Sequence, residues 1–278
     1  MRKPTRLDLR KTLFILPNLI TLSSVFCGFD SIRISANAQG EEDFYRAALL
    51  IVFAMLFDML DGRVARMTKT QSAFGLQIDS LADVVSFGAA PALLVYQWTL
   101  HRLGTPGLVA SFLFVAFGAV RLARFNVLSM GESGKPTKPS KYIVGLPIPG
   151  AAGILVSIVV ANHAVAGAIG RAEYAWGMLG VTVFLSFLMV STVRFRSFKD
   201  IKLNLRTVLF VAFAIGSSVF ISMQMKPAFV LVWLLGFYIL LGIFESLWQL
   251  PRRLLRRGDG ATGPGEARTS TPPEPPAT

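Results

Sequence analysis

Long apolar stretches, separated by short polar segments, constrain this chain more than any other feature of its sequence. A helix that crosses a bilayer needs about 20 mainly apolar residues. Segments of this kind cover residues 15–36, 45–66, 76–99, 106–128, 143–162, 174–193, 206–224 and 228–249. Only 16% of the residues are charged, against about a quarter in soluble domains. The sequence therefore predicts an all-α polytopic integral membrane protein with about eight transmembrane helices.

The basic residues indicate how such a bundle lies in the membrane. With eight crossings, all but five of the 28 lysines and arginines fall on one side of the bilayer. The five on the opposite side are Arg33, Arg46, Arg102, Arg171 and Lys226. Because cytoplasmic loops are enriched in Lys and Arg, we expect both termini in the cytoplasm. The placement of basic residues in cytoplasmic loops, where they attract anionic lipid headgroups, also explains the net charge of +12. We therefore expect no nucleic-acid partner.

Four aspartates stand in two neighbouring apolar segments. Asp58 and Asp61 are three residues apart, Asp79 and Asp83 are four apart, and each pair shares one face of its helix. The two helices are antiparallel, with a joining turn at about 67–75, so both pairs lie near the cytoplasmic ends of the first few helices. A carboxylate at mid-bilayer costs about 2.5 kcal/mol or more and is a functional hypothesis by default.

Four carboxylates that face one cavity repel one another unless they are protonated or hold cations. Oxygen ligands without Cys or His select a hard ion such as Mg²⁺, Mn²⁺ or Ca²⁺. His101 and His163 map to the outer side, which argues against a zinc site built on histidine. We therefore expect two divalent cations, an arrangement that suits phosphoryl chemistry.

Small and basic residues accompany the aspartates. Gly62 and Ala65 leave room beside them, Arg66 can bind a phosphate with two hydrogen bonds, and Gly75 permits close backbone approach at the turn. This pattern favours a diphosphate site that opens to the cytoplasm. The alternative for Gly62 and Ala65 is close helix–helix packing.

The stretch "DMLDGRVARMTKTQSAFGLQIDSLAD", residues 58–83, fits the pattern D-x2-D-G-x2-A-R-x8-G-x3-D-x3-D without a departure. It resembles the CDP-alcohol phosphotransferases, integral membrane enzymes of phospholipid synthesis. The resemblance implies that the four aspartates bind two divalent ions, Mg²⁺ or Mn²⁺, and that Asp83 is also the general base. It further implies a homodimer, and a CDP site lined by Gly62, Ala65, Arg66 and Gly75.

Segments outside this motif resemble the bacterial phosphatidylserine synthase branch of the family. They are "LPNLIT" (16–21), "DSLADVVSFGAAPA" (79–92), "RLARFN" (121–126) and "GLPIPGAA" (145–152). That resemblance implies the reaction of CDP-diacylglycerol with L-serine to give phosphatidylserine and CMP, in the cytoplasmic (inner) membrane of a bacterium. Two alternatives stay open: another acceptor (glycerol 3-phosphate, inositol phosphate or choline), or an ion- or proton-coupled transporter that uses its intramembrane carboxylates.

The serine carboxylate needs a cationic partner. Arg121 and Arg124 lie one turn apart near the cytoplasmic end of their span, and Lys141 follows in the next loop. We favour Arg124 for the acceptor pocket, with Arg121 and Lys141 as further candidates. The alternative for one of the two arginines is an interfacial side chain that reaches toward the headgroups.

Polar residues of the first and third spans are further candidates. Asn18 and Thr21 share a face near the cytoplasmic end of the first span and are expected at the diphosphate. The alternative for Asn18 is to cap the helix. Ser80 and Ser86 suit hydrogen bonds between helices as well as ligand contacts.

The expected domain organisation follows from these assignments. Residues 1–14 form a basic cytoplasmic segment, and residues 15–250 form the transmembrane catalytic domain. Within it, the family core covers about 15–193, and extra helices cover about 206–249. Residues 251–278 form a tail that is first basic and then, being rich in Pro, Gly, Ser and Thr, disordered.

Overall fold

The structure is a computed structural model of the chain, and it describes residues 9–68, 70, 72–129, 142–165, 172–196, 216–218, 222 and 227–258. The helices are α1 (Leu9–Ala36), α2 (Glu41–Met67), α3 (Ala73–Asp83), α4 (Ala90–Trp98), α5 (Thr105–Ser129), α6 (Ile148–Ala164), α7 (Ala175–Val190) and α9 (Ala228–Gly258). Shorter elements are the π-helical turn η1 (Val84–Ala89), the 3₁₀ turns η2 (Leu100–Leu103) and η3 (Ala172–Tyr174), and the strands β1 (Tyr142–Val144) and β2 (Arg194–Arg196).

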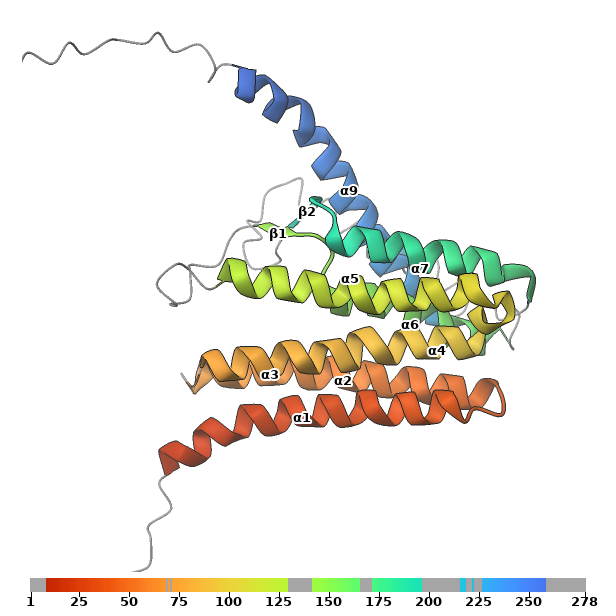
Figure 1. The fold of residues 1–278 in the computed structure, drawn as a ribbon, viewed down its shortest axis with the longest axis horizontal. Helices are drawn as coiled ribbons and strands as arrows, with labels where there is room; N and C mark the ends of the chain where they lie inside the picture. Colours follow the sequence, from red (N-terminus) through yellow and green to blue (C-terminus); the bar gives the residue numbers. More distant parts are fainter. Residues whose placement is uncertain are drawn as a thin grey trace, which may run out of the picture.

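The helices form an elongated bundle whose long members run side by side (Figure 1). α1, α2 and the continuous α3–η1–α4 unit form one part, and α5, α6 and α7 lie against it, while α9 leaves the bundle obliquely. The α1–α2 and α4–α5 connections lie at one end, and the α2–α3 connection lies at the other. The core sits where the middle elements meet, because Phe87, Trp98, Phe114 and Leu155 are its large, fully buried side chains.

The helices agree in part with a membrane-spanning bundle. Among the described residues, those long and apolar enough to cross a bilayer cover Leu16–Ala36, Ala73–Trp98, Thr105–Leu128 and Ala172–Val190. Two shorter apolar helices cover Ile148–Ala164 and Ala228–Ile243. α2 has 27 residues but carries more charge, because it holds the first aspartate pair. The predicted span 206–224 lies outside the described residues, apart from 216–218 and 222.

The predicted fifth span begins later than its apolar pattern suggested. β1 pairs antiparallel with β2, Tyr142 opposite Arg196, so the chain is helical with one small strand pair and is not purely α. Gly145 follows with a φ of +79°, and α6 starts only at Ile148, with a proline in its first turn. The positive φ ends the extended segment, and the proline suits a helix start because its missing N–H has no partner there.

The two ends of the chain lie partly outside the described residues. α1 already begins at Leu9, within the predicted basic cytoplasmic segment 1–14, and α9 continues to Gly258, through the basic part of the predicted tail. The stretch 259–278, where we expect disorder, lies outside the described residues.

Candidate active site

The α2–α3 connection brings the two aspartate pairs together. α3 starts at Ala73 because Ser72 caps it, its hydroxyl oxygen accepting a hydrogen bond from the Gly75 N–H at 3.0 Å. The turn is therefore shorter than the predicted 67–75, and Gly75 lies in the first turn of the helix. A Cβ at Gly75 would lie 3.2 Å from Ser72 Oγ and 3.8 Å from Asn18 Oδ1, so α1 passes close to this backbone.

Three of the four aspartates form a cluster that could hold a metal ion. One carboxylate oxygen from each of Asp58, Asp61 and Asp79 lies within 4.8 Å of the others. Asp61 is only 4% exposed, and the other two are half-buried. Oxygen donors this close, drawn from two helices, fit a hard divalent cation.

Asp83 lies one turn beyond the cluster on α3. The Asp58 carboxyl group lies within hydrogen-bonding reach of the Asp83 carboxyl group. The Oδ1 atom of Asp83 is buried, with no hydrogen-bond partner among the described residues. Buried polar atoms are almost always paired, so this oxygen is available to a cation or to a proton donor that comes with a ligand.

Helix α1 reaches the cluster through Thr21. The Thr21 hydroxyl donates to Asp61 Oδ2 at 2.5 Å, and Thr21 is 5% exposed. We expected this residue at the diphosphate, and here its hydroxyl holds a carboxylate. Asn18 lies on the same face and close to Gly75, but α1 begins at Leu9, so the alternative in which Asn18 caps the helix is wrong.

The space beside the first aspartate pair is open. A Cβ placed on Gly62 would have only the Arg66 guanidinium near it, with Nη1 at 3.6 Å and no atom of another described helix within 4 Å. Packing against a second helix therefore does not explain this glycine within the described part of the chain. Ala65 is half-buried, and Arg66 is exposed at the same end of α2. This small surface beneath a guanidinium suits the approach of a phosphate.

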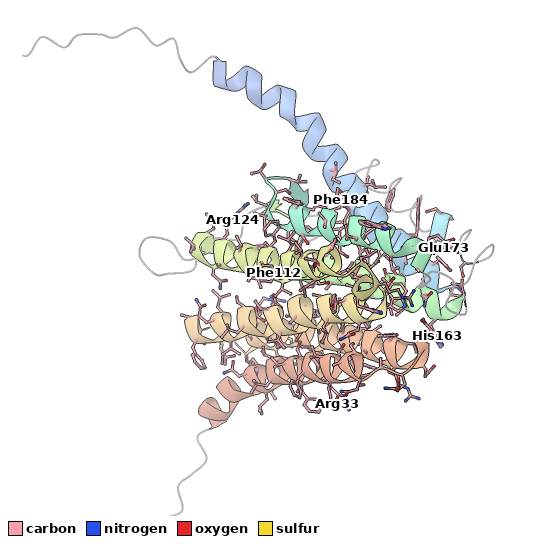
Figure 2. The ribbon with its side chains drawn as sticks, turned by 45° about the vertical axis from the view of Figure 1, so that its right-hand side comes forward. Arg33, Phe112, Arg124, His163, Glu173 and Phe184 are labelled. Carbon is pink, nitrogen blue, oxygen red and sulfur yellow. The ribbon has the colours of Figure 1, made fainter. Side chains whose placement is uncertain are left out.

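The two arginines of α5 have different surroundings. Arg121 interacts electrostatically with Asp83, its Nε is buried without a partner among the described residues, and its guanidinium lies 5.7 Å from the Phe125 ring centroid. Arg124 Nη1 donates to the Val190 carbonyl at 3.1 Å, at the end of α7. Figure 2 shows Arg124 at one end of the bundle and His163 and Glu173 at the other. Lys141 lies outside the described residues.

Both serines that we considered make hydrogen bonds between helices. Ser80 accepts from Asn126 Nδ2 at 2.8 Å, which joins α3 to α5. Ser86 donates to the Ser24 carbonyl at 3.0 Å, which joins η1 to α1. Sequence reasoning did not single out Ser24 or the nearby Gly28. Their spacing from Thr21, three and seven residues, is the signal that could have shown a shared face.

The sequence pattern of the CDP-alcohol phosphatidyltransferases matches residues 14–188. The chain belongs to this family. The match runs from α1 nearly to the end of α7, and it confirms the resemblance that the aspartate motif indicated.

Curated relatives align with most of the chain. A CDP-diacylglycerol–serine O-phosphatidyltransferase of Helicobacter pylori (strain J99) is 38% identical over 250 residues, which is 90% of this chain and 98% of the relative. One of Bacillus subtilis (strain 168) is 32% identical over 66% of this chain and 91% of the relative. An archaetidylserine synthase of Methanothermobacter thermautotrophicus is 36% identical over 68% of this chain and 72% of the relative.

Proposed function

We propose that this chain joins CDP-diacylglycerol and L-serine to give phosphatidylserine and CMP. The observation that carries the proposal is the cluster of Asp58, Asp61 and Asp79, with the buried Asp83 Oδ1 atom, unpaired among the described residues, one helical turn away. The names of the relatives support serine as the acceptor, and the H. pylori enzyme aligns with nine-tenths of the chain. The family assignment favours a transferase over an ion-coupled transporter.

The metal ligands in this proposal are Asp58, Asp61, Asp79 and Asp83. Two Mg²⁺ or Mn²⁺ ions bound there would neutralise the diphosphate and stabilise the charge that develops on CMP as it leaves. The close approach of the Asp58, Asp61 and Asp79 oxygens supports this role, because without a cation three carboxylates at such distances repel one another. Thr21 orients Asp61 by its hydrogen bond and so acts through a ligand.

Asp83 is the proposed general base. Its unpaired oxygen takes the proton of the serine hydroxyl, and the serine oxygen attacks the phosphorus that bears the diacylglycerol. The bond from that phosphorus to the bridging oxygen breaks, and this oxygen leaves with CMP. In L-serine the hydroxyl and the carboxylate are on neighbouring carbons, so the base and the carboxylate-binding cation must be neighbours too. Arg121, which interacts electrostatically with Asp83, is the cation that we propose for this role.

The nucleotide end of the substrate has a separate set of proposed contacts. Arg66 binds phosphate from α2, while Gly62 and Ala65 leave the space beneath it. Gly75 and Asn18 line the facing side, where α1 passes the start of α3.

The proposed setting is the cytoplasmic (inner) membrane of a bacterium, with eight spans, both termini in the cytoplasm, and a homodimer. The basic residues near the aspartate end of the bundle support this orientation. Cytosolic serine then reaches the site from the water, while the acyl chains of the lipid stay in the bilayer.

An acceptor panel tests the reaction. The purified chain in detergent micelles with CDP-diacylglycerol and Mn²⁺ should release CMP with L-serine, and chelation of the metal should abolish release. Glycerol 3-phosphate, inositol phosphate and choline should be inert. If serine is inert while one of these acceptors reacts, the proposed function is wrong.

The Asp83→Asn variant tests whether Asp83 is the general base. It should lower kcat on the order of 10³-fold or more, because an amide cannot accept the proton. Asp30→Asn is the matched control, since Asp30 pairs with Arg33 near the far end of α1 and should leave kcat unchanged. Near-normal turnover by Asp83→Asn would remove Asp83 from this role.

A further inference from the structure

The helix that carries Asp79 and Asp83 changes its hydrogen-bonding pattern directly after Asp83. Residues Val84–Ala89 form a π-helical turn, in which the Ala90 N–H donates to the Val85 carbonyl, five residues back. A π turn inserts one extra residue into a helix. One residue rotates an α-helix by about 100°, so this turn sets the angle between the aspartates and the apolar half of the span.

Helix α1 contacts this turn at two positions on one face. The Ser86 hydroxyl donates to the Ser24 carbonyl at 3.0 Å, and the Ser24 hydroxyl contacts Ser86 Oγ at 3.3 Å. One turn along α1, a Cβ on Gly28 would lie 2.7 Å from the Ser86 Cα and 2.8 Å from its Oγ. Both serines are buried, at 0% and 2% exposure. The α1 backbone therefore lies against the wide turn, with no room for a side chain at residue 28.

The same face of α1 also contacts Asp61 of the other aspartate pair. Thr21, three residues before Ser24, donates to Asp61. One helix thus contacts both halves of the carboxylate cluster, α2 through Thr21 and the α3–η1 unit through Ser86.

We infer that Ser86 and Gly28 are positioning residues for Asp83: they seat the π-helical turn against α1 and thereby aim the Asp83 carboxylate at the cluster. The inference rests on the proposed metal role of Asp83. Neither residue touches a substrate, and each acts through the backbone that carries the aspartate. Ser86→Ala removes the hydrogen bond to α1, and Gly28→Ala forces the two backbones apart.

Metal binding by the full purified chain in detergent tests this inference. Mn²⁺ affinity is measured from the loss of the free-ion signal in electron paramagnetic resonance, with thermal unfolding followed on the same samples. Groups that orient metal ligands typically change metal affinity 10–100-fold when removed. We expect Ser86→Ala and Gly28→Ala to weaken Mn²⁺ binding by about tenfold or more.

Two further variants sharpen the result. Ser24→Ala keeps the backbone carbonyl that Ser86 uses and loses only the 3.3 Å contact, so its effect should be smaller than that of Ser86→Ala. Ser157→Ala is the matched control, because Ser157 is also fully buried but bonds to Ile154 of its own helix, and its Mn²⁺ affinity should equal that of the wild type.

The failures are distinguishable. If the wild-type chain binds no Mn²⁺, the proposed metal role is wrong and this inference falls with it. If the wild type binds Mn²⁺ and Ser86→Ala binds it equally well, only the inference is overturned. Should Gly28→Ala not fold, the comparison of Ser86→Ala with Ser24→Ala and Ser157→Ala decides the question.

Discussion

Arg121 and Arg124 lie one helical turn apart on α5, yet their guanidinium groups have different partners. Arg124 donates to a backbone carbonyl at the end of α7, where a positive charge also interacts favourably with the helix dipole. Arg121 interacts electrostatically with Asp83, and its Nε atom is buried with no hydrogen-bond partner among the described residues. A guanidinium whose buried Nε atom has no partner among the described residues fits a substrate that brings an anionic group of its own.

Replacing each arginine separately distinguishes a role in serine binding from a role in stabilising the fold. Arg121→Gln should raise the KM for serine about tenfold or more, because a lost charged hydrogen bond costs about 1.5–3 kcal/mol, while the KM for CDP-diacylglycerol changes little. Arg124→Gln should mainly lower the thermal unfolding temperature. Steady-state kinetics over both substrates measure the difference. The opposite pattern, with serine binding lost only in Arg124→Gln, would assign the acceptor to Arg124.

Sequence reasoning could predict the aspartate cluster but not the roles of these arginines. The spacing within each aspartate pair and the antiparallel order of α2 and α3 bring the carboxylates together through local geometry alone. Arg121 and Arg124 look alike from their spacing. What distinguishes them is a carbonyl 66 residues further along the chain, whose position depends on how α7 ends.

At the scale of elements, the end of α7 joins three parts of the chain. The Leu146 N–H donates to the Leu188 carbonyl at 3.1 Å, the Gly145 N–H donates to the Val193 carbonyl at 2.8 Å, and Arg124 reaches the Val190 carbonyl from α5. The contacts to Leu188 and Val190 supply partners for carbonyls that the end of a helix leaves unpaired. They also fix the segment that leads from β1 into α6.

Gly145 is the most constrained residue of this junction. Its φ of +79° disfavours any side chain by about 1–2 kcal/mol, and a Cβ there would lie 2.2 Å from the Met189 carbonyl oxygen. Gly145→Ala should therefore lower the thermal unfolding temperature markedly. Gly180→Ala is the control. Gly180 lies within α7, and a Cβ added there would meet no atom of a neighbouring described element within 4 Å, so the change should be neutral or stabilising. Equal stability of the two variants would contradict this account of the junction.

The π-helical turn η1 and the β1–β2 strand pair could not be predicted from the sequence, and the reason is physical. The apolar pattern of residues 76–99 is that of one continuous helix, and it predicts the span well. Nothing in this pattern marks the π turn within it, against which α1 packs closely, Gly28 against Ser86. Similarly, the predicted span 143–162 begins with apolar residues that pair with a strand 50 residues later.

At the scale of the whole molecule, the proposed orientation makes a direct prediction. Cys27 is the only cysteine of the chain, so Cys27→Ala gives a background for single labels. Gln39→Cys, in the α1–α2 connection, should react with a membrane-impermeant maleimide on intact spheroplasts. Met67→Cys, at the other end of α2, should react only after permeabilisation, because both side chains are exposed and the proposed topology puts them on opposite sides of the membrane. Reversed labelling would invert the proposed topology.

The attachment of both aspartate pairs to α1 also bears on how the protein is made. All four aspartates, together with Thr21, Gly28 and Ser86, lie within the first 86 residues of a 278-residue chain. The ribosome synthesises the chain from the N-terminus, at about 5–20 residues per second. The carboxylates can therefore assemble in the nascent chain before the ribosome has translated Arg121, so the half of the centre proposed to bind ions precedes the half proposed to hold serine.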